Sequence, residues 1–350
     1  MPSLSALPGR PRAAGRLARS PQLAAALAAR LTARDRWLLR MLHEHRVLTT
    51  SQITQLAFGT TRAATARLAV LYQYRAVDRF RPLAPAGSSP LHFVLDEAGA
   101  LLLATEDGIT TAELGYRRDR SMAIALSPRL AHDTGANGVF TALAAAARAS
   151  GGQAALECWW GERRCAAAWG EHARPDGYGR WTEQDPSRPA AAVDFFLEYD
   201  TGTEPLTRVI GKLAGYAALA ARTGITTPVL YWLRSPSREA ALHARLAGPP
   251  PPGVPGAVSA AQIPGVPVAS AARGTAPGGP AGAAWLPAAS PGPRLRLAQL
   301  APPGTVQASG GPDGDAPDGS PGLPWHPPEP APPAWNALPG EPRPGQDDDD

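Results

Sequence analysis

Apolar residues recur at helical spacing in three consecutive segments near the start of the chain. The first, 32–48, has them three or four positions apart, and Thr32 stands where a helix N-cap is expected. The second, 49–59, repeats the pattern and ends at Gly59, a residue type that commonly terminates helices. The third, 60–77, again opens on a threonine. The pattern predicts three short helices in a row.

A strand pattern follows in 77–99, interrupted by a tip rich in Pro, Gly and Ser, and predicts a β-hairpin. Three helices and a hairpin predict a winged helix-turn-helix domain at 31–104. In such a domain the third helix enters the DNA major groove and the hairpin reaches the backbone. The candidate DNA-binding residues are Thr61, Arg62, Thr65 and Arg67 on the third helix and Arg79 and Arg81 on the hairpin. A winged helix that contacts only protein is the alternative.

A second series of elements follows a predicted linker at 105–131. It starts with a helix at about 132–149, after which the periodicity changes to that of strands. Three strands are predicted at 154–160, 174–181 and 190–200, a helix at 204–222 and a fourth strand at 227–233. This α-β-β-β-α-β order predicts an α+β or α/β domain over 132–300. Its last part holds a low-complexity insertion at 245–263 and two short strands at 265–271 and 283–287.

The two ends of the chain lack such patterns. Residues 1–30 contain arginines and no acid, which predicts a flexible basic arm. Residues 301–350 are rich in Pro and Gly and end in four aspartates. Such a composition cannot bury enough apolar surface to offset the entropy of ordering, so a disordered tail is expected. A protein partner for this Pro-rich tail is the alternative.

Composition narrows the class of protein. The formal net charge is +4, which favours an anionic partner. No apolar run approaches the roughly 18–20 residues of a membrane helix, so no membrane contact is expected. The two cysteines are too few for a disulfide framework, which fits a cytoplasmic protein. Cys158, Cys165 and His172 lack a fourth ligand, so a zinc site is not expected.

The order of the elements resembles that of the restriction-endonuclease-like, PD-(D/E)XK, nucleases. Asp176 follows a proline, as in that motif, and Glu198 begins a Glu-x-Asp triplet. Together with the winged helix, the stretches "RPDGYGRW", "FFLEYDTGTE" and "KLAGY" resemble the replication-relaxation family of actinobacteria over residues 30–300. That family is linked to plasmid DNA, so the resemblance implies double-stranded plasmid or mobile-element DNA as a partner.

The resemblance also implies a catalytic set of Asp176, Glu198, Asp200 and Lys212. The sequence departs from the nuclease motif, because Asp200 stands where the motif has a lysine. Lys212, the chain's only lysine, is the candidate replacement from the following helix. Two functions are therefore expected as alternatives. One is a DNA-nicking or DNA-cleaving enzyme. The other is a non-catalytic DNA-binding factor, recruitment factor or transcriptional regulator with a degenerate nuclease fold.

The residues themselves suggest a cation site. Side chains alternate along a strand, so Glu198 and Asp200 share one face of 190–200, and Asp176 on the neighbouring strand can approach them. Clustered carboxylates repel each other unless a cation lies between them, and oxygen ligands favour Mg²⁺ or Mn²⁺. The alternative is that the two acids only cap the next helix. His132 beside Asp133 is expected to be structural.

Overall fold

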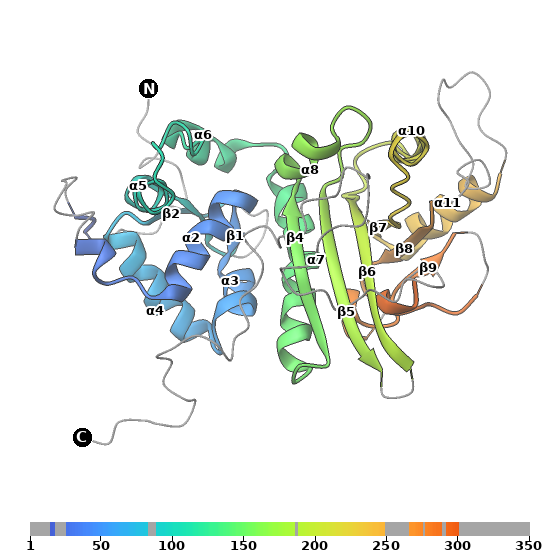
Figure 1. The fold of residues 1–350 in the computed structure, drawn as a ribbon, viewed down its shortest axis with the longest axis horizontal. Coiled ribbons are helices and arrows are strands. Elements are labelled where there is room, and N and C mark those ends of the chain that lie inside the picture. Colours follow the sequence, from blue (N-terminus) through green and yellow to red (C-terminus); the bar gives the residue numbers. More distant parts are fainter. Residues whose placement is uncertain are drawn as a thin grey trace, which may run out of the picture.

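The computed structural model describes residues 15–17, 26–82, 89–185, 188–248, 266–275, 277–288 and 292–300. The fold is the mixed α+β type that the sequence predicts, with a three-stranded and a six-stranded sheet (Figure 1). The predicted tail at 301–350 and most of the insertion at 245–263 lie outside the described residues. None of the described helices combines the length and the apolar character needed to cross a membrane.

A first unit contains the predicted helices and hairpin. Its elements are α2 (Ala33–His45), β1 (Leu48–Thr49), α3 (Thr50–Ala57), α4 (Thr61–Gln73), β2 (Val77–Phe80), β3 (His92–Leu95) and α5 (Glu97–Glu106). Its sheet has the order β1-β3-β2 and is antiparallel. Thr32, Thr49 and Thr60 accept hydrogen bonds from the first turns of α2, α3 and α4. The threonine caps therefore fix where each helix begins.

The segment expected as a linker has structure of its own. It contains α6 (Arg118–Ala123) and the 3₁₀ helix η2 (Ile124–Leu126). Met122 and Ile124 are buried in a small apolar cluster with residues of β2 and β3. Part of the expected flexible arm is also held, because Arg16 makes an ion pair with the buried Asp78 at 3.2 Å.

A second unit is built on the six-stranded sheet, with the order β4-β5-β6-β7-β8-β9. Its strands are β4 (Ala154–Gly161), β5 (Gly177–Asp185), β6 (Arg188–Tyr199), β7 (Val229–Leu233), β8 (Val268–Ala272) and β9 (Leu286–Pro287). The first three strands are antiparallel neighbours, whereas β7 runs parallel to β6 and β8 parallel to β7. The sheet is therefore mixed, and β6 lies where the antiparallel part meets the parallel part.

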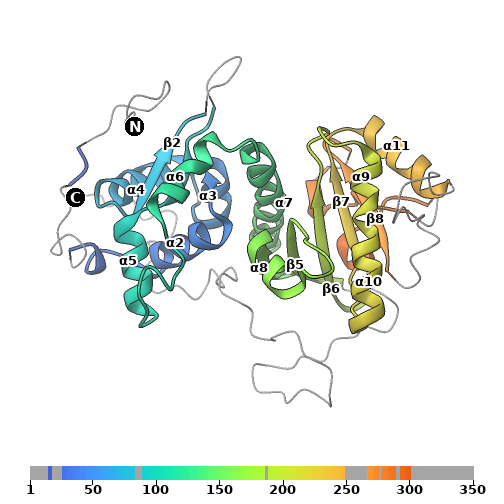
Figure 2. The same ribbon diagram turned by 90° about the horizontal axis from the view of Figure 1, so that it is seen from above.

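Helices cover both faces of this sheet. Seen from above in Figure 2, α7 (Leu130–Ala149) lies between the first unit and the sheet, while α9 (Leu206–Gly211) and α10 (Leu213–Thr223) lie on the other face. Side chains of β6 pack against the helices on both faces. Phe195 stacks on Phe140 of α7, and Phe196 packs against Tyr216 of α10. The alternation of its side chains thus holds α7 and α10 on opposite faces.

Three features of this unit differ from the sequence prediction. The helices α8 (Glu162–Trp169) and α11 (Pro236–Ala247) were not predicted, although Ser235 caps α11 and Pro236 occupies its first turn. The helix expected at 204–222 is divided at Lys212 into α9 and α10. Two short 3₁₀ helices, η4 (Gly279–Ala281) and η5 (Leu297–Leu300), accompany the last strands.

Close contact between α7 and β6 makes Gly135 a stability test. A Cβ at Gly135 would overlap the Tyr199 ring, whereas a Cβ at Gly138 of the same helix would meet only Gln52 Nε2, at an ordinary 3.5 Å. Gly135→Ala should lower the free energy of unfolding by about 1–3 kcal/mol, since overpacking displaces the ring. Gly138→Ala should be neutral or stabilising by up to about 1 kcal/mol. Urea unfolding measures both, and equal values for the two variants would contradict this packing.

Candidate functional site

One edge of the large sheet gathers the ends of several strands. Gly177 at the start of β5 pairs with Gly161 at the end of β4 and with Leu197 near the end of β6 (Figure 1). Asp176 directly precedes β5, and its backbone N–H donates to the Leu197 carbonyl at 3.0 Å. Its carboxylate Oδ2 accepts from the Tyr199 backbone N–H at 2.8 Å. Strand pairing therefore places Asp176 beside the end of β6, next to Glu198.

Glu198 is held by two donors from the helix layer. Its side chain is only 3% exposed. Lys212 Nζ donates to Glu198 Oε2 at 2.6 Å, and the Tyr216 hydroxyl donates to Oε1 at 2.5 Å. Lys212 lies at the break between α9 and α10, and its side chain is 38% exposed. Arg208, one turn earlier on α9, is exposed and lies 3.8 Å from Glu204.

The charges in this cluster influence one another. Burial and the neighbouring Asp176 charge raise the pKa of Glu198, Lys212 and Tyr216 oppose them, and the pKa comes to about 7. Burial works against the charge of Lys212, but Glu198 and Asp176 outweigh it and raise the pKa of the lysine. Two carboxylates and one ammonium group therefore form one electrostatic unit, as expected when like charges share a buried site.

His132 joins the unit from the first turn of α7. Its Nε2 lies 3.1 Å from Asp176 Oδ2, and its ring meets the Tyr199 ring edge-on at 5.7 Å. Burial opposes its charge, but Asp133 and Asp176 raise the pKa of His132 to about 10. Burial raises the pKa of Asp176, but the contact with His132 outweighs burial, so the pKa of Asp176 is lowered. The sequence predicts only a structural role for His132 and does not predict this contact. The contact arises because α7 packs beside the strand ends, which no local sequence signal indicates.

Asp200 does not join Asp176 and Glu198. β6 ends at Tyr199, and the Asp200 carboxylate makes a bidentate ion pair with Arg238 of α11, with Arg238 Nη2 2.9 Å from Oδ1. Oδ1 also accepts from the Gly202 backbone N–H at 3.1 Å. Arg238 in turn donates to the Glu204 carbonyl at 2.5 Å. Asp200 therefore shapes the 200–204 loop. The helix-capping alternative is wrong, because Pro205 is the N-cap of α9 and no side chain caps that helix.

The metal expectation changes accordingly. In the part of the chain that the structure describes, no three His, Cys, Asp or Glu side chains gather as a metal site. The described residues offer no hydrogen bond to Asp176 Oδ1, so this oxygen is open to a further ligand. Mg²⁺ commonly takes only one or two carboxylates, with water and phosphate completing its shell. Asp176 and Glu198 fit such a site, provided that Lys212 releases Glu198, whereas Asp200 does not.

The predicted DNA-binding residues divide into two groups. Thr61, Arg62 and Thr65 are exposed along α4. Arg67 is instead turned to the buried Asp35, with Nε and Nη2 at 2.9 and 2.5 Å from its two oxygens. Asp35 is also the capping-box partner of Thr32, so Arg67 ties α4 to the start of α2.

The hairpin arginines are less exposed than the leading residues of α4. Arg79 lies over the Tyr72 ring at 4.3 Å and is half-buried, as is Arg81. The Nε atoms of both arginines are buried without a hydrogen-bond partner among the described residues. The exposed N-terminal part of α4 is therefore the stronger candidate for DNA contact.

The contact between Asp176 and His132 can be tested by titration. Asp176→Asn should lower the pKa of His132 from about 10 toward its usual value, because a stabilising negative charge is removed. Asp200→Asn is the matched control and should leave it unchanged, since Asp200 is paired with Arg238. Since the folded pKa lies above the unfolded value, the stabilisation from His132 is complete below about pH 6.5 and is lost as pH rises toward 10. NMR of the imidazole measures the pKa, and equal shifts in the two variants would contradict the geometry.

Comparison with known proteins agrees with the resemblance in the sequence. The chain matches the replication-relaxation family over residues 39–230, which run from the middle of α2 to the start of β7. No curated protein and no solved structure matches the chain. The match contains the cluster of Asp176, Glu198 and Lys212 as well as α4, and it covers more than half of the chain. Membership of this family suggests a role in plasmid or mobile-element replication or relaxation. The chain therefore belongs to the replication-relaxation family.

Proposed function

We propose that this protein binds double-stranded DNA of a plasmid or mobile element and cleaves or nicks it with Mg²⁺ or Mn²⁺. The observation that carries the proposal is the contact of the chain's only lysine with Glu198, beside Asp176, at one sheet edge. Two carboxylates can hold a divalent cation and an ammonium group can contact a phosphate oxygen, which suits metal-dependent phosphodiester hydrolysis. Here they come from three separate segments: the residue before β5, the end of β6, and the junction of α9 with α10.

Each residue has a distinct role in the proposed reaction. A divalent cation held by Asp176 and Glu198 would supply Lewis-acid stabilisation of the charge that develops on the phosphate. Lys212, released from Glu198, can point its ammonium group at a non-bridging phosphate oxygen, since it is already partly exposed. His132 keeps Asp176 oriented through the 3.1 Å contact with Oδ2, and Tyr216 keeps Glu198 oriented through Oε1. The acids are thereby held in place before the substrate arrives.

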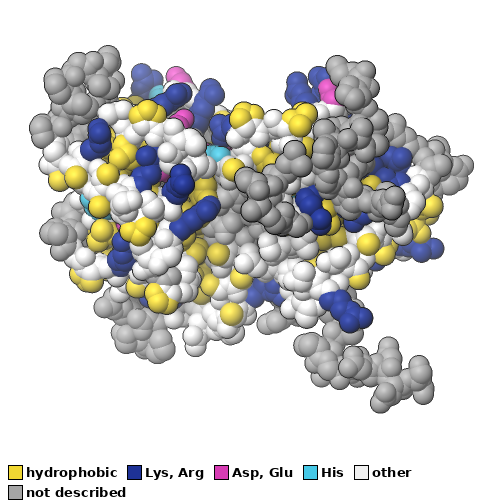
Figure 3. All heavy atoms as spheres, turned by 180° about the vertical axis from the view of Figure 1, so that it is seen from behind, with side chains coloured by type: hydrophobic (Ala, Val, Ile, Leu, Met, Phe, Trp, Pro, Cys, Tyr) yellow, Lys and Arg dark blue, Asp and Glu magenta, His cyan; other side chains and the backbone are white. Residues whose placement is uncertain are grey.

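The proposed DNA contact lies on the first unit. Its element order, with α3 and α4 followed by the β2–β3 hairpin, supports a winged helix-turn-helix in which α4 is the reading helix. Arg62, Thr61 and Thr65 are exposed near the N-terminus of α4, where side chains can reach phosphates and base edges. Basic side chains also recur over the face seen in Figure 3, where acidic ones are sparse. Both features suit an anionic partner.

A non-catalytic DNA-binding or recruitment factor is the second candidate. A specific observation favours it: Lys212 and Tyr216 together occupy both oxygens of Glu198, and Arg238 neutralises Asp200. Such an arrangement is stable without a cation. In that case the sheet edge would only grip DNA, and Lys212 would contribute packing and charge balance.

DNA binding through α4 can be tested at Arg62. Arg62→Glu should weaken duplex binding at least about tenfold and reduce the salt dependence, because phosphate contacts dominate affinity. Arg222→Glu, exposed on α10 and carrying the same change of charge, is the control and should change affinity much less. Fluorescence anisotropy over a range of salt concentrations measures both. Equal losses would place the DNA surface elsewhere. Arg67 is unsuitable for this test because its replacement also breaks the Asp35 ion pair.

The catalytic proposal depends on Lys212. Wild-type protein should convert supercoiled plasmid to the nicked or linear form with Mg²⁺ or Mn²⁺ and not with EDTA. Lys212→Arg should lose cleavage by about 100-fold while retaining DNA binding, because a planar guanidinium cannot replace a compact ammonium group. Arg208→Gln, on the exposed side of α9, is the matched control and should cleave normally.

Two outcomes would overturn the catalytic proposal. If Lys212→Arg cleaves as fast as the wild type, the lysine has no catalytic role. If the wild type binds plasmid but cuts it with neither metal, the non-catalytic function replaces the proposal.

A further inference from the structure

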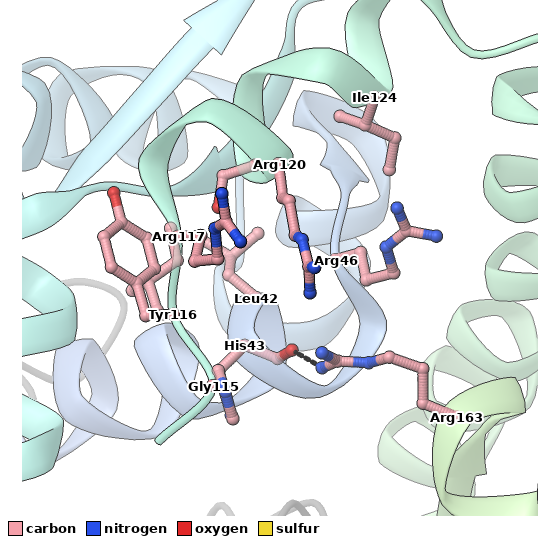
Figure 4. A pocket seen from close by; sticks show the side chains of 11 residues that line it. Leu42, His43, Arg46, Gly115, Tyr116, Arg117, Arg120, Ile124 and Arg163 are labelled. Atoms are coloured by element: carbon pink, nitrogen blue, oxygen red, sulfur yellow. Dashed lines mark hydrogen bonds between the residues drawn. The ribbon is translucent and has the colours of Figure 1, made fainter. Parts of the chain in front are cut away.

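A cavity of about 210 Å³ lies where the first unit meets α6 and α8. Arg46, Arg117, Arg120 and Arg163 line it, together with His43, and no acidic residue is in the lining. Figure 4 shows the four arginine side chains approaching from three separate segments: the end of α2, the stretch around α6, and α8. Four positive side chains around one hollow repel one another, so their gathering calls for a counter-charge.

The described residues supply only part of that counter-charge. Arg163 donates to the backbone carbonyls of His43 and Glu44, which carry partial charges only. Arg46 lies 3.7 Å from Asp133. Arg120 makes no ion pair among the described residues. Desolvation lowers the pKa of Arg163, the charge of Glu44 opposes this, and the charges of Arg46 and Arg164 add to the lowering.

Arg117 is the remaining arginine of the cavity, and it is paired at the rim. It lies 3.2 Å from Asp119, and both of these side chains are more than half exposed. An exposed ion pair of this kind contributes little and is easily exchanged. Arg117 can therefore turn to another anion at low cost.

The backbone at Arg46 is unusual in the same place. Arg46 ends α2 with a φ of 66°, a conformation that non-glycine residues adopt rarely. Such strain persists only where the surrounding structure enforces it, and it concentrates at functional sites. Arg46 is also one of the residues that line the cavity.

The cavity also adjoins the proposed catalytic edge. A smaller hollow of about 40 Å³ shares Arg46 and Arg163 with it, and its lining also contains His132, Asp176 and the acids Glu44, Asp133 and Glu162. The two hollows therefore meet at these two arginines. An anion bound by Arg46 and Arg163 would lie at the boundary between this cavity and the smaller hollow that Asp176 lines.

We infer that Arg46, Arg117, Arg120 and Arg163 form a binding site for a phosphate group. Guanidinium groups bind phosphate oxygens through paired N–H donors, and several arginines on one anion are a common arrangement for phosphate recognition. The cavity is smaller than a typical pocket for a drug-sized ligand of about 300 Å³ or more, so it suits a phosphate or diphosphate moiety. That moiety has two sources: a phosphodiester of bound DNA, or the phosphates of a free nucleotide. The site does not depend on cleavage at Glu198.

The test replaces Arg117 and Arg120 and leaves the other two arginines of the cavity unchanged. Arg117 and Arg120 are exposed, whereas Arg163 also joins α8 to α2. The variant Arg117→Gln/Arg120→Gln is compared with Arg222→Gln/Arg245→Gln, which removes two exposed arginines from α10 and α11. Both variants lose the same net charge. Thermal unfolding establishes that both keep the wild-type fold.

Calorimetry with pyrophosphate and with a deoxynucleoside triphosphate, and anisotropy with a short duplex, measure binding to the full chain. The cavity variant should bind a phosphate ligand at least about tenfold more weakly than the control variant. A loss for pyrophosphate and nucleotide assigns a free phosphate ligand, and a loss for duplex alone assigns the DNA backbone. If the two variants bind all three probes equally, the cavity is not a phosphate site. Because the readout is binding, an inactive catalytic edge would leave this result unchanged.

Discussion

The burial of the Glu198 carboxylate is the constraint on which the sheet edge depends. An ionised carboxylate that is 3% exposed must be compensated, because an unpaired buried charge would cost several kcal/mol or would take up a proton. Lys212 and Tyr216 supply that compensation from the helix layer. Lys212 lies where α9 gives way to α10, and its ammonium group reaches Glu198 at the strand end. The chain's only lysine thus stands where a compact, directional charge is needed.

The same edge connects the two units of the molecule. Asn137 of α7 donates to the carbonyls of His45 and Val47 at the end of α2, and the Gly161 backbone N–H donates to Glu44 at 3.0 Å. The apolar core is continuous from α2–α4 through α7 to the inner face of the sheet. A ligand held at the junction would therefore contact elements of both units. The proposed reading helix, the arginine-lined cavity and the carboxylates belong to one connected body.

Local signals in the sequence predicted much of this arrangement. Periodicity and threonine caps predicted the three N-terminal helices, and strand patterns predicted β4, β5, β6 and β7. Long-range partners had no local signal. Asp200 was grouped with Glu198 because both follow the same alternation, but its partner Arg238 lies on a helix that was not predicted. Similarly, the position of Arg67 on α4 predicted a DNA contact. In the structure Arg67 forms an ion pair with the buried Asp35, which lies on α2. The replication-relaxation resemblance was confirmed.

The central claim is that Asp176 and Glu198 receive a divalent cation and release Lys212 toward a phosphate. Anomalous diffraction at the manganese edge, from crystals grown with a short duplex and Mn²⁺, tests it most directly. The account predicts one manganese peak about 2.1 Å from carboxylate oxygens of both acids, with Lys212 Nζ moved from Glu198 to a phosphate oxygen and no peak at Asp200. A structure with DNA bound, no manganese at these acids and Lys212 still hydrogen-bonded to Glu198 would contradict it.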